Sequence, residues 1–160
     1  MRDGALPAAL IVAALALALS FAPPRVRIPA FLAMAIAALA MMIFEFPREQ
    51  ANLVYLVGWA VVVLTAACVH WRGGLPVRYA LVLALLCGVV AGSVASLADG
   101  VRDLAAASPA LLLFLPARWL VARGWGISVK VISSWLIVIA VLAAALSLTP
   151  TPGYAPDHMD

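Results

Sequence analysis

Long apolar stretches, separated by proline, glycine or charged residues, dominate the pattern of this chain. A helix that crosses the hydrocarbon core of a bilayer, about 30 Å thick, needs about 20 mainly apolar residues. Proline pairs, Gly-Gly and Asp-Gly interrupt the apolar stretches at points where a helix ends or the chain turns. The pattern predicts six membrane spans, at residues 5–22, 29–46, 52–70, 78–98, 104–122 and 130–148.

The fifth predicted span is short and interrupted by proline. It contains Pro109 and Pro116, and Arg118 leaves only about 14 apolar residues ahead of the charge, fewer than a comfortable crossing needs. A re-entrant or interfacial helix is the alternative. Proline is tolerated in membrane helices when neighbouring groups satisfy the freed carbonyls, and an arginine near a helix end can reach the interface.

The distribution of basic residues favours six crossings over five. With the N-terminus outside, seven of the ten basic residues fall on the cytoplasmic side, as positive-inside bias requires. These residues are Arg25, Arg27, Arg72, Arg78, Arg118, Arg123 and Lys130. The outer side receives Arg2, Arg48 and Arg102. Both termini are then outside, and the arginine-rich composition is typical of a bacterial cytoplasmic (inner) membrane protein.

Composition supports the same fold class. Hydrophobic residues make up 67% of the chain and charged residues 11%, whereas soluble domains carry about a quarter charged residues. We therefore expect an all-α, polytopic membrane helix bundle, with a single domain at 1–148 and a proline-rich polar tail at 149–160. The net charge of +3 is explained by membrane orientation and does not indicate nucleic-acid binding. The stretch 143–160 resembles the first helix and following loop of VanZ-like membrane proteins, a likeness that implies no residue role.

The fourth predicted span carries small residues at every fourth position. This spacing places them on one helix face, where they allow another helix backbone to approach closely. The partner is either a helix of the same chain or another subunit. The predicted helix-packing face consists of Ala84, Gly88, Gly92 and Ser96.

Two groups of charged residues near predicted helix ends are candidate binding sites. A polar site on the outer face, for a cation or a polar ligand, is predicted at Glu45, Asp99, Arg102 and Asp103. Contacts to lipid phosphates or to an anionic partner are predicted on the cytoplasmic side at Arg118, Arg123 and Lys130. Arginine suits the second role because its planar guanidinium binds phosphate through two parallel hydrogen bonds.

The remaining polar residues suggest no catalytic, cofactor or metal site. Cys68 and Cys87 lie in apolar runs, and we expect no disulfide between them. His70 and His158 fall on opposite faces of the predicted topology, so they cannot share a metal ion. The chain has no GxSxG, HExxH or GxxxxGK[ST] motif.

Three functions follow from these observations. The first is a non-catalytic subunit or assembly partner of a larger membrane complex, suggested by short loops and the small-residue helix face. The second is a transporter, channel or substrate-capture subunit for a small solute. The third is a membrane enzyme of lipid or cell-envelope metabolism. The expected partners are membrane lipids and either other membrane subunits or further copies of the chain, with no nucleic acid.

Overall fold

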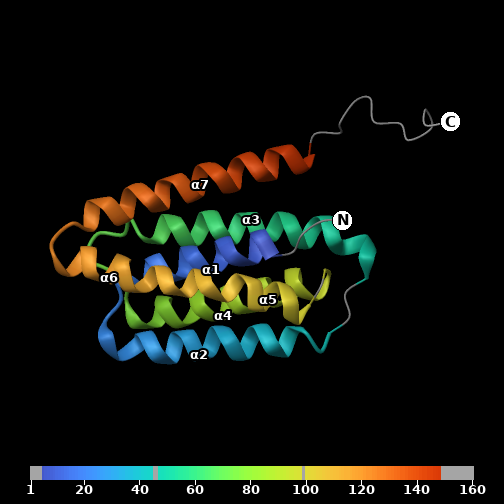
Figure 1. Ribbon diagram of the computed structural model, residues 1–160, viewed down its shortest axis with the longest axis horizontal. Helices are drawn as coiled ribbons and strands as arrows, with labels where there is room; N and C mark the ends of the chain where they lie inside the picture. The colour runs from blue at the N-terminus through green and yellow to red at the C-terminus, as the bar shows by residue number, and fades with distance from the viewer. Residues whose placement is uncertain (1–4, 45–46, 99, 149–160) are drawn as a thin grey trace.

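The computed structural model describes residues 5–44, 47–98 and 100–148. All regular structure in these residues is helical, which confirms the predicted all-α class (Figure 1). The helices are α1 (Ala5–Ser20), α2 (Pro24–Met41), η1 (Arg48–Gln50), α3 (Ala51–Cys68), α4 (Val77–Ser96), α5 (Val101–Ala107), η2 (Ser108–Leu113), α6 (Phe114–Ala122) and α7 (Gly126–Leu148). The tail predicted at 149–160 lies outside the described residues.

Five helical segments are long and apolar enough to cross a membrane. They are α2, α3, α4, the continuous segment Val101–Ala122 and α7. The sixth apolar helix, α1, has 16 residues and rises about 24 Å. The described residues thus establish a helix bundle with several membrane-length helices, while six crossings and two outside termini remain predictions.

The segment predicted to be the weakest span is helical throughout. It consists of α5, the 3-10 helix η2 and α6, and it rises about 36 Å in total. Pro109 lies at the start of η2, where the tighter 3-10 pattern joins the two α-helices. The segment is therefore long enough to cross, even though two prolines remove backbone donors from it.

Two helices begin earlier than the sequence predicted. α2 starts at Pro24, and Pro29, predicted to be its first residue, lies inside the helix. Pro24 occupies the first turn, where a missing N–H costs little, and Pro29 leaves only the carbonyl of the exposed residue Arg25 without its helical partner. Likewise α7 begins at Gly126, ahead of Lys130. Both predicted starts were wrong: at α2 the residues around Arg25 and Arg27 were assigned to a loop, and at α7 the helix was predicted to begin at the charged residue Lys130, four residues late.

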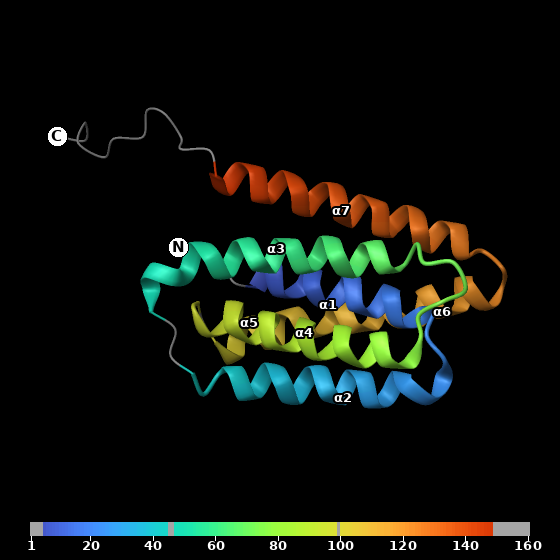
Figure 2. The ribbon, with the colours of Figure 1, turned by 180° about the vertical axis from the view of Figure 1, so that it is seen from behind.

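α1 forms the centre of the bundle. It contacts α3, α4, α7 and all three parts of the segment Val101–Ala122, and every residue from Ile11 to Ser20 is buried. α2 packs on α4 at one side, and α7 packs on α3 at the other (Figures 1 and 2). A helix that is hydrophobic on all faces suits a fully surrounded position.

α2 and α4 approach each other closely along two glycines. A Cβ atom added to Gly88 would lie 2.9 Å from the Cα atom of Met34, and one added to Gly92 would lie 2.8 Å from the Cα atom of Ala38. Ala84, Gly88 and Gly92 are buried, whereas Ser96 is partly exposed. At the two glycines, then, the atoms that crowd this face belong to α2 of the same chain.

Candidate functional site

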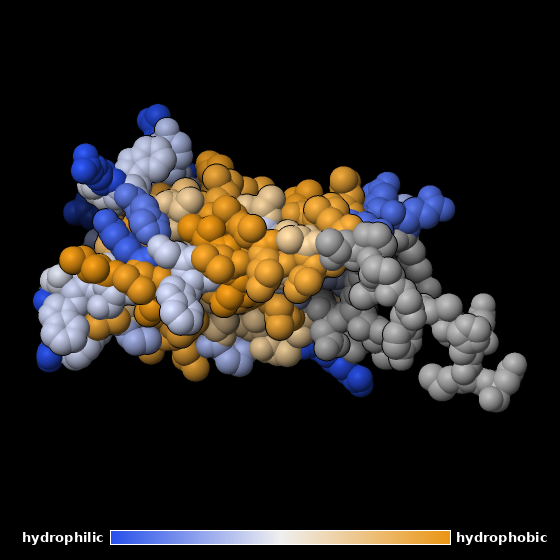
Figure 3. Space-filling model, turned by 90° about the horizontal axis from the view of Figure 1, so that it is seen from above, coloured by the Kyte–Doolittle hydropathy of each residue, from blue (hydrophilic) through white to orange (hydrophobic). Residues whose placement is uncertain are grey.

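Charged side chains gather at the two ends of the bundle and leave an apolar belt between them. Figure 3 shows this belt in orange between bluish ends. We call one end the basic end, where α1 passes to α2 and α6 passes to α7 (Figure 1). It holds Arg25, Arg27, Arg72, Arg78, Arg118, Arg123 and Lys130. The opposite end, where α1 begins and α7 ends, we call the pocket end.

The polar site predicted on the outer face falls partly outside the described residues. Glu45 and Asp99 are not described. Asp103, in the first turn of α5, is 8% exposed, whereas the neighbouring Arg102 is exposed. A carboxylate near a helix N-terminus is favoured by the helix dipole. Asp103 also makes an interaction within the chain, and these two residues alone do not define a binding site.

The three cations predicted to contact lipids all lie at the basic end, in different settings. Arg123 places its guanidinium 4.2 Å from the ring centroid of Trp119, a cation–π distance. Arg118 is exposed on α6, and its charge acts on Arg27 of α2. Lys130 lies on α7, where its carbonyl accepts hydrogen bonds from Ser133 and Ser134. The predicted trio therefore separates, and Arg118 is paired with an arginine that the prediction did not include.

A serine and a histidine that the sequence did not connect lie close together at the basic end. The Oγ atom of Ser134 on α7 lies 3.2 Å from Nε2 of His70, just beyond α3. The same hydroxyl donates to the carbonyl of Lys130 at 3.0 Å, so its single proton is already used. Both residues are exposed. The geometry links the end of α3 to α7, and it does not present an activated nucleophile.

The cysteines remain thiols, and the described residues form no metal cluster. Cys87 is fully buried on α4, with its Sγ atom 3.3 Å from Oγ1 of Thr65 on α3. Cys68 is free at the end of α3. Among the described residues, no group of three or more His, Cys, Asp or Glu side chains lies close enough to hold a metal ion.

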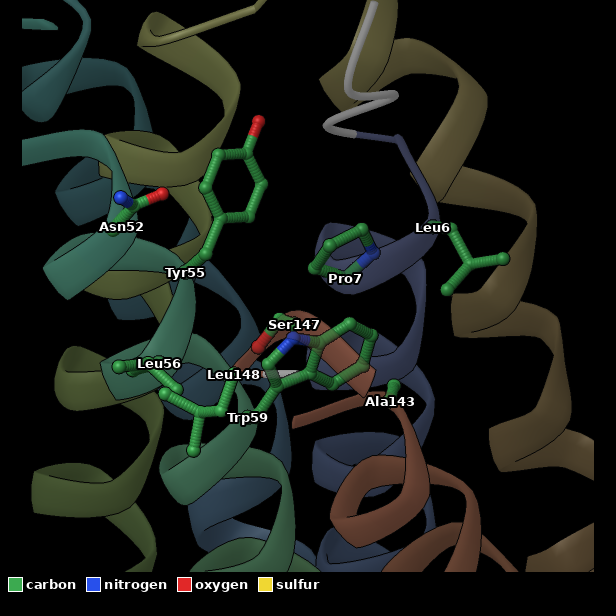
Figure 4. Close-up of a pocket in the computed structure, with 9 residues that line it drawn as sticks. All are labelled: Leu6, Pro7, Asn52, Tyr55, Leu56, Trp59, Ala143, Ser147 and Leu148. Carbon is green, nitrogen blue, oxygen red and sulfur yellow. The ribbon is translucent and has the colours of Figure 1, made fainter. Parts of the chain in front are cut away.

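A pocket of about 450 Å³ opens at the pocket end between α1, α3 and α7. Figure 4 shows the side chains that line it, which come from these three helices. The described residues that line it are Leu6, Pro7, Asn52, Tyr55, Leu56, Trp59, Ala143, Ser147 and Leu148. Its volume falls within the range of about 300–1,000 Å³ typical of small-molecule sites.

Spacing along α3 explains how the pocket wall forms. Asn52, Tyr55, Leu56 and Trp59 are three or four residues apart, which places them on one face of the helix. Their span along α3 corresponds to about 10 Å of depth. The wall therefore descends from polar groups near the membrane surface to an aromatic ring deep in the bundle.

Trp59 is the deepest polar feature of this pocket. Its side chain is only 7% exposed, and its indole N–H makes no hydrogen bond with any of the residues that the structure describes. No buried side-chain nitrogen or oxygen among the described residues lacks a partner, so this N–H is accessible from the pocket. In Figure 4 the indole nitrogen lies on the side of the ring nearest Ser147. A buried indole normally satisfies its N–H, and here a bound molecule can supply the acceptor.

This pocket was not predicted from the sequence. The spacing of Asn52, Tyr55, Leu56 and Trp59 along the sequence is enough to place them on one face of α3. The opposing wall, with Ala143 and Ser147 on α7, lies more than eighty residues away in sequence, and no local pattern connects the two. No protein-family model, curated protein or solved structure matches this chain.

Proposed function

We propose that this protein captures a small amphiphilic molecule in the pocket between α1, α3 and α7. The observation that carries the proposal is the largely buried indole of Trp59, which lines a pocket of ligand size and whose N–H has no acceptor among the described residues. This role corresponds to the substrate-capture hypothesis for a small solute.

The lining chemistry supports an amphiphile over a fully polar solute. Leu56, Ala143, Leu148 and the ring of Trp59 provide apolar surface for a tail or ring system. Asn52 lies in the first turn of α3, at the level where a polar head group would meet the interface. Most binding sites for small molecules share this design, an apolar lining with a few polar groups that fix orientation.

The predicted topology implies on which side of the membrane the pocket opens. With both termini outside a bacterial inner membrane, the pocket end faces outward and the basic end faces the cytoplasm. The captured molecule would then enter from the outer half of the membrane. Transport across the bilayer would require a further subunit or copy, because the pocket extends only about 10 Å into the bundle.

The test is recovery of the molecule that co-purifies with the protein from its own membrane. Protein extracted in mild detergent is denatured, and the released small molecules are identified by mass spectrometry. W59F keeps an aromatic ring and removes the N–H donor, and a lost hydrogen bond lowers occupancy by about fivefold to tenfold. A143F blocks the pocket and should abolish recovery.

W135F is the matched control, because Trp135 lies on α7 with 70% of its side chain exposed and does not line the pocket. Equal recovery from wild type, W59F and A143F would refute the capture function. If W59F, A143F and W135F all lost the molecule equally, the cause would be damage to the whole helix bundle and not the loss of a specific pocket contact.

One observation favours the second candidate, a non-catalytic subunit of a membrane complex. Trp135 lies near the middle of α7, yet membrane tryptophans concentrate at the interfaces. Tryptophan is also enriched where proteins contact one another. A photo-crosslinker at position 135 should then capture a specific membrane protein or a second copy, whereas one at Leu112, exposed on a different segment, should capture only lipid.

A further inference from the structure

A pair of arginines at the basic end faces across two helices without a counter-ion. Arg27 belongs to α2 and Arg118 to α6, and the two side chains are close enough for their like charges to interact. Among the described residues, neither has a carboxylate as an ion-pair partner. The two carboxylates whose side chains are described, Glu49 on η1 and Asp103 on α5, lie at the pocket end.

Two phenylalanines bridge the same helices one turn deeper. Phe31 follows Arg27 by four residues on α2, and Phe114 precedes Arg118 by four residues on α6, so each arginine shares a helix face with one ring. The ring centroids are 5.3 Å apart in an edge-to-face arrangement. The guanidinium carbon of Arg27 lies 5.7 Å from the centroid of Phe114. Because α2 and α6 run in opposite directions, both arginines lie on the interface side of the rings (Figure 1).

The backbone further fixes Arg27. Its Nε atom donates to the carbonyl of Ala22 at 3.0 Å, and the side chain is partly buried. The two terminal nitrogens of the guanidinium are left for another acceptor. Arg118 is exposed, so its guanidinium is accessible to the same anion.

From this arrangement we infer that Arg27 and Arg118 bind the head group of an anionic phospholipid between α2 and α6. Guanidinium groups bind phosphate oxygens through paired, charge-assisted hydrogen bonds. Basic pockets between membrane helices favour anionic lipid heads. The Phe31–Phe114 pair lies where the upper part of an acyl chain would run, and a soluble phosphate would make no use of it.

This site is independent of the pocket between α1, α3 and α7. It lies at the opposite end of the bundle and shares no residue with that pocket. Loss of the captured amphiphile would leave lipid binding at the arginines intact. Loss of lipid binding would likewise leave capture in the pocket intact.

The experiment is a lipid titration by native mass spectrometry of delipidated protein in a neutral detergent. Phosphatidylglycerol and phosphatidylcholine with identical acyl chains are compared. Both lipids carry a phosphate, but the choline cation of phosphatidylcholine is repelled by the two arginines, so wild-type protein should bind the anionic lipid about tenfold more tightly. Equal binding of the two lipids would overturn the assignment.

Two double variants separate a specific site from general charge. R27Q/R118Q should abolish the preference for phosphatidylglycerol. R72Q/R78Q removes the same amount of charge from exposed arginines at the same end and should keep the preference for phosphatidylglycerol. An equal loss in both variants would overturn the specific site, because it would mean that the whole basic end attracts the lipid without a clamp.

Two further arms keep the inference testable if the first variant folds poorly. R118Q alone changes an exposed side chain that has no hydrogen bond to the described part of the chain, and it should still reduce the preference severalfold. Inorganic phosphate at millimolar concentration should leave lipid binding unchanged. Displacement of phosphatidylglycerol by phosphate would overturn the lipid assignment in favour of a soluble anion.

Discussion

α1 and α7 are both strongly apolar helices, yet one forms the centre of the bundle and the other lies at its edge. Twelve of the 16 residues of α1 are buried, against four of the 23 residues of α7. The buried residues of α7, Val129, Ser133, Leu136 and Ala140, follow a narrow stripe of alternating three- and four-residue steps. This stripe packs on α3, and the rest of α7 faces outward.

Side-chain size distinguishes the two helices better than hydrophobicity does. α1 is built mainly from alanine and leucine, whereas the outer face of α7 carries large side chains such as Trp135, Val138 and Leu142. In a bilayer, the lipid is as apolar as the protein interior, so hydrophobicity alone does not draw a helix inward. Close van der Waals packing does, and small residues permit it.

The largest expected effect on helix packing is that of a substitution at Gly92. In G92A the added methyl group would meet the backbone of Ala38 on α2, so we expect a loss of about 2–3 kcal/mol in the free energy of unfolding. The matched change G58A places its methyl group 3.4 Å from Val94, an ordinary contact, and gains helix propensity of up to about 1 kcal/mol. Denaturant titration in mixed micelles measures both. Equal effects of the two substitutions would show that backbone approach at Gly92 does not matter.

Leucine truncation compares the two helices directly. Leu15 is fully buried in α1, whereas Leu142 on α7 is 59% exposed. L15A leaves a cavity at the centre and should cost about 2 kcal/mol or more. L142A removes contacts with lipid or detergent and should change the unfolding free energy by less than about 0.5 kcal/mol. A large cost for L142A in native membrane extracts, absent from purified protein, would reveal a partner that covers α7.

Much of the architecture was predictable from the helix-breaking residues along the chain. Proline and glycine positions gave the approximate ends of the helices, whereas the starts at Pro24 and Gly126 lie earlier than the sequence predicted. The central place of α1 was not predictable, because a helix without an apolar stripe gives no direction toward its neighbours. It depends on how all the other helices pack around it.

The candidate sites depend on distant pairs that local patterns do not reveal. Arg27 and Arg118 are on separate helices, as are Ser134 and His70, which are 64 residues apart. The sequence did single out Arg118 as a candidate lipid contact, because a charged residue in a membrane helix is unusual on its own. Its neighbours in space became apparent only from the packing.

The smallest expected effect is that of the buried polar contact between Thr65 and Cys87, which tests whether polar contacts help to hold the helices together. Both side chains are fully buried between α3 and α4, with their oxygen and sulfur atoms 3.3 Å apart. Hydrogen bonds between membrane helices average about 0.6 kcal/mol, because each group finds another partner when the helices separate. In a double-mutant cycle of T65V and C87A, we expect a coupling energy of that size. A coupling above about 2 kcal/mol would mean that polar contacts, as well as small side chains, hold the centre together.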